Sequence, residues 1–179
     1  MQYIVSLALL VALAAWMVGV YNNLNHLREA VCRCWSQWRV VTQRRNMELK
    51  DFATSLSSYV PQESSLPGNL LRLVADSERS LLLSDRPRWS SRHGFLGGAE
   101  RLLRMTVTQA VQAVEMQSDS HLQQLCHSVS ASLYQQDQVT ELFNHAAREY
   151  NAALMLPSAR ILAPVLGFSA VDSLDDAEM

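Results

Sequence analysis

The first 25 residues of the chain carry no charged side chain, and this feature limits the fold more than any other. Within them, the apolar run from Tyr3 to Val20 is interrupted only by Ser6. A helix needs about 20 predominantly apolar residues to cross the hydrocarbon core of a bilayer. The sequence therefore predicts a transmembrane helix at residues 1–22.

A cleavable signal peptide is the main alternative interpretation of this run. Ala12-Leu13-Ala14 resembles a cleavage site. However, Met1-Gln2 provides no basic residue ahead of the apolar run, and the run continues past the site, whereas signal peptides begin with a basic region and end at the cleavage site. We therefore expect the span to be retained.

The charges around the run predict its orientation. Only the terminal amine precedes it, while Arg28, Arg33 and Arg39 follow it. Basic residues within about 20 residues of a span favour the cytoplasmic side. We expect a single-pass protein of a bacterial inner membrane, with its N-terminus outside and the remaining chain in the cytoplasm. Three cysteines, an odd number, fit that reducing compartment.

Small residues form a stripe along the predicted span. They recur at spacings of four, three and four, and they are Ala8, Ala12, Ala15 and Gly19. Such a stripe lets a second helix approach closely, which predicts self-association in the membrane. Alanine-rich spans also show this spacing by chance, so both interpretations stay open.

The predicted span is expected to continue into the cytoplasm as one helix. Neither glycine nor proline occurs between Gly19 and Pro61, so the helix can extend to Tyr59. A coiled-coil-like seam follows it at Leu24, Leu27, Val31, Cys34, Trp38, Val41, Leu49, Phe52, Leu56 and Tyr59. Arg45 and Glu48 interrupt this seam and are close enough to pair along the helix. A paired or solvated polar layer is favoured there over a catalytic pair.

Two shorter helices are predicted in the middle of the chain. Residues 61–68 are expected to form a loop, after which Asn69 caps a helix. Its inward face is predicted to contain Leu70, Leu73, Val74, Ser77 and Leu81. The other short helix is predicted from Ala99 to Gln117, with Leu103, Val107, Ala110 and Val114 among its inward residues.

A second long helix is predicted over residues 119–156, where Asp119 or Ser120 provides the cap and Pro157 ends the helix. We expect it to pair with the first helix, with Trp38, Leu49, Phe52 and Leu56 facing Leu125, Val129, Phe143 and Tyr150. The predicted fold is all-α, with the transmembrane helix continuing into an antiparallel up-down-up-down four-helix bundle over residues 23–157.

Residues 158–179 are predicted to form an apolar docking segment and an acidic tail. Ile161, Val165 and Phe168 are among too few apolar residues to span a bilayer. Packing of this segment on Leu24, Leu27 and Val31 is favoured over a position in the membrane interface. Residues 118–179 hold two arginines against eight carboxylates, although the net charge of the chain is only −2. This balance argues against nucleic acid as a partner.

The segment from residue 84 to residue 98 is a candidate partner-binding loop. It combines arginine with aromatic residues, a pairing typical of interface hot spots, at Arg86, Arg88, Trp89, Arg92 and Phe95. The alternative is a solvated connection whose arginines meet anionic lipid headgroups.

Two blocks of residues resemble the signature of a known family. One block contains Trp35-Ser36-Gln37, then Gln43 and the pair Arg44-Arg45. The other contains Asn144-His145-Ala146-Ala147-Arg148-Glu149-Tyr150-Asn151, then Pro157-Ser158 and Gly167-Phe168. Their order and spacing resemble the LemA family, whose C-terminal signature is Asn-x-Ala-x-Arg-x-Tyr-Asn, Pro-Ser and Gly-Phe. Similar proteins usually have a proline soon after the arginine pair. This chain lacks that proline, so it resembles a divergent member of the family.

The sequence contains no pattern typical of an active site, a metal site or a cofactor site. Its five histidines show no metal-binding pair, and the block from Arg148 to Asn151 has the composition of an ordinary helix surface. The resemblance implies a membrane-anchored helical bundle. We expect a non-enzymatic scaffold or adaptor for membrane or envelope proteins. The alternative is an accessory subunit of a membrane protease or envelope quality-control system.

Overall fold

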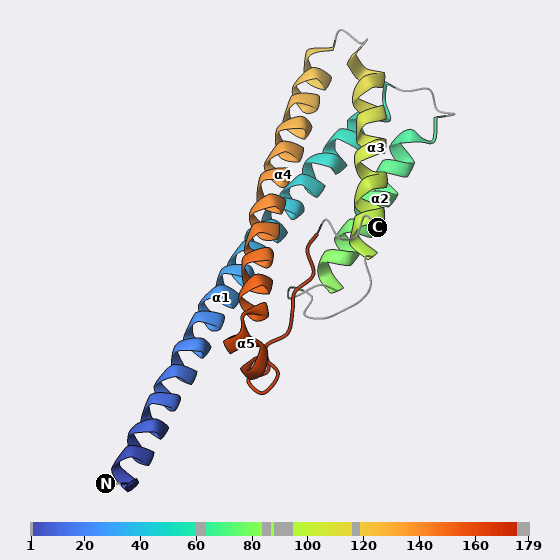
Figure 1. Ribbon diagram of the computed structural model, residues 1–179. Coiled ribbons are helices and arrows are strands. Elements are labelled where there is room, and N and C mark those ends of the chain that lie inside the picture. The colour runs from blue at the N-terminus through green and yellow to red at the C-terminus, as the bar shows by residue number, and fades with distance from the viewer. Residues whose placement is uncertain (1, 60–63, 84–86, 88–94, 116–118, 175–179) are drawn as a thin grey trace.

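The computed structural model describes residues 2–59, 64–83, 87, 95–115 and 119–174. In these residues the chain forms five helices and no strand (Figure 1). They are α1 (Gln2–Leu56), α2 (Leu66–Leu83), α3 (Phe95–Glu115), α4 (Ser120–Met155) and α5 (Pro157–Leu162). The prediction of an all-helical chain is confirmed.

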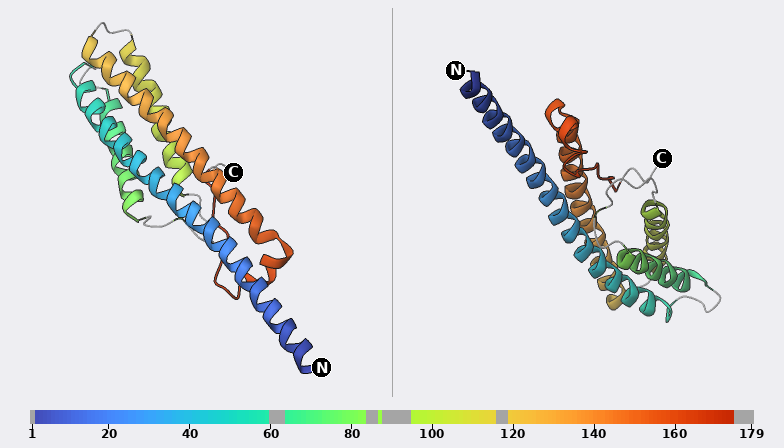
Figure 2. Two further views of the ribbon diagram at one scale, coloured as in Figure 1. Left: turned by 90° about the vertical axis from the view of Figure 1, so that its left-hand side faces the viewer. Right: turned by 90° about the horizontal axis from the view of Figure 1, so that it is seen from below.

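The longest element is α1, an uninterrupted helix of 55 residues. No proline breaks its hydrogen-bond ladder, and its last glycine is Gly19. The C-terminal part of α1 lies among the other helices, whereas its N-terminal part projects beyond them (Figures 1 and 2). A single helix therefore links the apolar run to the rest of the chain, as predicted.

The helices α1 and α4 lie side by side and run in opposite directions (Figure 2). Where they meet, the Trp35 and Trp38 rings stack with their centroids 5.0 Å apart. The Trp35 ring also lies 5.4 Å from that of Phe143, and the Trp38 indole nitrogen donates to the Thr140 hydroxyl at 3.1 Å. The predicted burial of Trp38 and Phe143 is confirmed, and Trp35 joins them.

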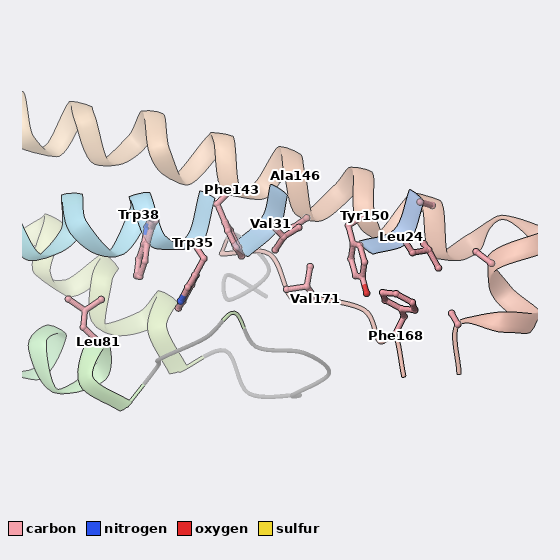
Figure 3. Close-up of a cluster of buried hydrophobic side chains, with 14 residues drawn as sticks. Leu24, Val31, Trp35, Trp38, Leu81, Phe143, Ala146, Tyr150, Phe168 and Val171 are labelled. Atoms are coloured by element: carbon pink, nitrogen blue, oxygen red, sulfur yellow. The ribbon is translucent and has the colours of Figure 1, made fainter. Parts of the chain in front are cut away.

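Buried side chains form two clusters along α1. The tryptophan cluster lies toward the projecting part of α1 and contains Leu24, Val31, Trp35, Trp38, Phe143, Tyr150, Phe168 and Val171, among others (Figure 3). The leucine cluster lies toward the other end, where α2 and α3 cover α1, and contains Leu49, Phe52, Leu56, Leu70, Val74, Leu103, Val107 and Val129, among others. Together they bury most of the predicted apolar seam, although Val41 is only half-buried and belongs to neither cluster, and Tyr59 is exposed.

Two helix starts differ from the sequence-based prediction. The helix α2 begins at Leu66, so Pro67 and Gly68 lie in its first turn instead of in a loop. Proline is tolerated in a first turn because the amide it lacks has no partner there. The helix α3 begins at Phe95 instead of Ala99. The expected inward residues of α2 are nevertheless correct, with Leu70, Leu73, Val74 and Leu81 buried.

The start of α4 is fixed by Asp119, as predicted. Its carboxylate accepts from the amides of His121 at 2.8 Å and Leu122 at 3.4 Å. It also accepts from the hydroxyl of Tyr59 at 2.6 Å, which ties the end of α1 to the start of α4. The Tyr59 hydrogen bond, followed by that of His121, lowers the pKa of Asp119, and the bond to Asp119 raises the pKa of Tyr59.

These pKa shifts predict a window of pH in which the contact is stabilising. A carboxylate with a lowered pKa stabilises the fold above about pH 4 and loses that effect as the pH falls through its folded-state pKa. A phenol with a raised pKa stabilises it below about pH 10 and loses that effect on the alkaline side. In Tyr59→Phe we expect the Asp119 pKa to rise, as measured by NMR titration. An unchanged pKa would show that the hydroxyl does not bind the carboxylate in solution.

Candidate functional site

The projecting part of α1 presents an apolar surface that no described residue covers. Every side chain from Tyr3 to Trp16 is exposed, and the exposed large residues include Leu7, Leu10 and Leu13. This segment is long and apolar enough to cross a membrane, a property that a signal sequence near an N-terminus shares. Leu24 is the first fully buried apolar residue of the helix. The boundary between uncovered and packed surface therefore lies near Tyr21.

The small-residue stripe belongs to this uncovered surface. Ala8, Ala12, Ala15 and Gly19 are all exposed. A Cβ atom added at Gly19 would meet no other atom within 4 Å. The stripe is thus free of contacts with the described part of the chain.

The residues after α4 turn back and attach to the base of the helical core. The positive φ of 73° at Gly167 fits the reversal of the chain, because glycine adopts this backbone conformation at low cost. The Phe168 ring then lies 5.8 Å from that of Tyr21 and 5.9 Å from the guanidinium carbon of Arg28. Phe168 and Ala163 share the tryptophan cluster with Leu24.

Three polar side chains of α4 hold the returning segment by its backbone. The Asn151 amide donates to the Val171 carbonyl at 2.7 Å, and its oxygen accepts from the Val171 amide at 3.0 Å. The Tyr150 hydroxyl donates to the Ser169 carbonyl at 3.0 Å, and the Asn144 side chain accepts from the Leu174 amide at 2.8 Å. We call Asn144, Tyr150 and Asn151 the tail clasp. Burial raises the pKa of the Tyr150 hydroxyl, which keeps it protonated as a donor.

The tail clasp corrects one interpretation made from the sequence. The block from Arg148 to Asn151 is not an ordinary helix surface throughout, because Tyr150 is buried and Asn151 is half-buried against the tail. Arg148 and Glu149 are exposed, as such a surface requires. In the sequence, the clasp is indicated by the spacing of Asn144 and Asn151. Residues seven positions apart lie on one face of a helix, two turns from each other.

The docking segment is only partly packed. The predicted packing on Leu24 and Val31 is confirmed for Ala163 and Phe168, which share a cluster with them. The prediction is wrong for Ile161 and Val165, which are 73% and 80% exposed. For Ile161 the reason is the short helix α5, which sequence reasoning missed, whereas Val165 lies in the turn after that helix. A helix presents opposite faces, so it turns Ala159 inward and Ile161 outward.

We expect loss of the Asn151 side chain to release the tail. In Asn151→Ala, the backbone groups of Val171 lose both partners, which costs about 2 kcal/mol locally. Amide hydrogen exchange at Val171 should therefore accelerate roughly thirtyfold. Asn69→Ala is the matched control, because Asn69 lies on α2 and its side-chain amide donates an exposed hydrogen bond to the Ser65 hydroxyl just before that helix. Equal exchange rates in the two variants would show that Asn151 does not hold the tail.

A buried polar cluster lies where α1, α2 and α3 meet. Arg45 has a side chain that is 0% exposed, and it forms an ion pair with Glu100. Its guanidinium also donates to the Asn46 side-chain oxygen at 2.9 Å and to the Ser77 hydroxyl at 3.4 Å. The Asn46 amide donates to Ser77 at 3.1 Å. The hydrogen bonds of the Arg45 guanidinium to Glu100, Asn46 and Ser77 offset the free-energy cost of removing its charge from water.

Arg45 and Glu48, whose spacing allows an ion pair, each have another partner in the described structure. Glu48 instead accepts from Arg44 at 3.1 Å and from the Ser128 hydroxyl at 3.2 Å. Sequence spacing allows both geometries, but Arg45 points into the core and reaches a carboxylate that lies 55 residues away in the chain. A paired polar layer is therefore present, as the sequence predicts. Arg45 pairs with Glu100, however, and Glu48 pairs with Arg44.

The described residues contain no group of three or more histidine, cysteine or acidic side chains that could hold a metal ion. Among the described residues no disulfide joins Cys32, Cys34 or Cys126, and each of these cysteines is half-buried. The buried guanidinium of Arg45 has its donors engaged by neighbouring side chains, so this cluster is suited to holding three helices together.

The candidate partner-binding loop falls outside the described residues at Arg86, Arg88, Trp89 and Arg92. Phe95 is the first residue of α3, and its side chain also lies outside the described part. Pro87 is described and is buried. The loop therefore stays a prediction from the sequence.

Comparisons with known proteins give no assignment for this chain. No protein-family signature, no curated protein and no solved structure matches it. The candidate site is therefore defined by the structure alone. It consists of the uncovered apolar part of α1 and of the tail that the clasp holds near Tyr21, where the packed part of α1 begins.

Proposed function

We propose that this chain is a divergent LemA-like protein that acts as a non-enzymatic scaffold or adaptor at a bacterial inner membrane. In this proposal α1 spans the membrane once with its N-terminus outside. The helices α1 to α4 form an up-down-up-down bundle that stands in the cytoplasm. The bundle presents its outer faces to other membrane or envelope proteins.

One observation carries the proposal. The apolar part of α1 lies outside the helical core while the same unbroken helix continues into that core. In water this exposed surface would be strongly unfavourable, whereas a bilayer covers a helix that is apolar on all sides. Because no loop separates the anchor from the core, the anchor also sets the position of the core relative to the membrane.

The interior of the described chain supports a scaffold more than an enzyme. Its buried charge, Arg45, is held by Glu100 and by two polar neighbours. The tail clasp uses its polar side chains to hold backbone. In both clusters the polar side chains hold parts of the fold together, as a scaffold requires.

The orientation is tested with C-terminal fusions. The arginines that follow the span predict that a fluorescent protein fused after Met179 is bright and that alkaline phosphatase in the same place is inactive. Both reporters are used because each is active on a different side of the membrane. An active phosphatase with a dark fluorescent protein would contradict the proposed orientation.

The adaptor role is tested by affinity purification of the detergent-solubilised chain, followed by mass spectrometry. We expect several membrane or envelope proteins to be recovered in repeated experiments, and a variant lacking residues 2–20 provides the control for membrane-dependent capture. Recovery of one recurrent membrane protease would favour the alternative role as an accessory subunit. Recovery of copies of this chain that depends on Ala8, Ala12, Ala15 and Gly19 would assign the small-residue stripe to self-association.

A further inference from the structure

We propose that the end of α4, the helix α5 and the turn that follows α5 form a second membrane-contact surface, which rests in the interfacial layer of the bilayer beside the point where α1 enters. This inference rests on the proposed membrane span. The surface consists of Met155, Leu156, Ile161 and Val165, and we call it the shoulder.

The shoulder is apolar on the side that faces away from the core. Met155 and Ile161 are 72% and 73% exposed, and Val165 is 80% exposed. The opposite side is fixed to the core, because Ala159 and Ala163 are buried in the tryptophan cluster. The exposed side chains therefore belong to a segment whose other side is packed on the tryptophan cluster.

The shoulder lies at the level where the predicted span ends. Tyr21 contacts Phe168, which follows α5 closely in the chain, and α5 lies beside α1 where the latter leaves the core (Figures 1 and 2). From Tyr3 to Val20 an α-helix rises about 27 Å, which is close to the hydrocarbon thickness of about 30 Å. When these residues span the bilayer, the shoulder reaches its interfacial layer.

The charges near the shoulder suit a lipid surface. Arg160 on α5 and Arg28 on α1 are both exposed, and each basic residue near an anionic leaflet contributes about 1 kcal/mol of attraction. The described part of the tail, up to Leu174, leads away from the bilayer. Val171 is held at Asn151 and Leu174 is held further back at Asn144, so the chain carries Asp172 toward the other end of the core.

Lipid also explains the exposed residues better than a protein partner does. The exposed apolar residues of the shoulder lie at the end of α4 and after it, at the level where the uncovered apolar part of α1 ends, as the contact between Tyr21 and Phe168 shows. An apolar surface that adjoins a membrane span at the interface is covered by headgroups and acyl chains without any further binding partner. We therefore assign the lipid bilayer as its occupant.

The test uses the full chain in vesicles of phosphatidylethanolamine and phosphatidylglycerol. The three cysteines are replaced by alanine, and single nitroxide labels are introduced by Val165→Cys, Val40→Cys and Leu10→Cys. Val40 is the matched control, because it is a valine that is 66% exposed on α1 far from the shoulder. Collisions with oxygen, which concentrates in lipid, are compared with collisions with a water-soluble nickel complex.

We expect the ratio of oxygen to nickel collisions at Val165 to be several-fold higher than at Val40 and to approach that at Leu10. A ratio at Val165 equal to that at Val40, or protection from both reagents, would overturn the shoulder while Leu10 still reports a membrane span. An aqueous ratio at Leu10 would overturn the span itself, and the shoulder with it. The two failures are therefore distinguished in one experiment.

Discussion

Replacing Glu100 by alanine is expected to lower the free energy of unfolding of the helical core by about 3 kcal/mol. The substitution leaves the guanidinium of Arg45 fully buried without its carboxylate, and loss of one partner of a buried ion pair typically costs about 3–5 kcal/mol. We expect the lower end of that range, because the Glu100 side chain is 26% exposed and water reaches the site. Chemical unfolding of the detergent-solubilised chain, followed by circular dichroism, measures the change.

Glu48→Ala is the matched control for this experiment. Glu48 is the carboxylate that sequence spacing allows to pair with Arg45, yet it binds Arg44, whose side chain is 67% exposed, and accepts a hydrogen bond from the Ser128 hydroxyl. An exposed pair of this kind contributes about 0.2–1 kcal/mol. If Glu48→Ala destabilises the core more than Glu100→Ala does, the cross-helix pairing is wrong and the intrahelical pairing is right.

A comparison with Arg45→Met separates charge from packing. This variant removes the buried charge and keeps most of the side-chain volume, and such replacements are often neutral or stabilising. We expect it to be more stable than Glu100→Ala. The reverse order would show that the hydrogen bonds of Arg45 to Asn46 and Ser77 matter more than the burial of its charge.

The second large effect is expected at the contact between α1 and α4. Trp38→Ala removes a ring that stacks on Trp35 and a hydrogen bond to Thr140. Truncation of a buried aromatic side chain to alanine costs about 3–5 kcal/mol, which is a large part of the stability of a small domain. The melting temperature of the core should therefore fall sharply.

Trp16→Ala provides a control with the same chemical change. Trp16 lies on the projecting part of α1 and is exposed, so its loss should leave the melting temperature of the core unchanged. Trp38→Phe keeps an aromatic ring in the cluster and is expected to fall between the wild-type chain and Trp38→Ala. An unaltered melt in Trp38→Ala would contradict the packing of α1 on α4.

The long helices could be predicted from the sequence because their signals are local. The spacing of apolar residues reports the buried face of a helix, and Asp119 and Pro157 mark where α4 begins and ends. The start of α2 could not be read in the same way. Pro67 and Gly68 are typical of a loop, and packing of the first turn on the core overrides that local preference.

Other features could not be predicted because they depend on contacts between distant parts of the chain. Arg45 meets Glu100 only after α1 and α3 have both packed on α2. The tail clasp depends on a reversal at Gly167 that brings Val171 back to Asn151. The apolar composition of residues 161–168 indicates docking, but only the short helix α5 decides that Ile161 faces outward.

The tail clasp gives a physical meaning to the residues that resemble the LemA signature. Asn144, Tyr150 and Asn151 of that block bind the backbone of the segment that follows Gly167-Phe168. The two parts of the C-terminal pattern thus lie against each other in space. We expect substitutions in either part to loosen the same segment.

The membrane anchor is the central claim, and intact mass spectrometry of the chain after carbonate extraction of membranes tests it most directly. Because the apolar part of α1 is uncovered by the described core, we predict that the chain stays in the carbonate-washed membrane with a mass of 20.1 kDa, which includes residues 1–14. Recovery from the supernatant of a chain shortened after Ala14 would contradict the account and identify the run as a signal peptide.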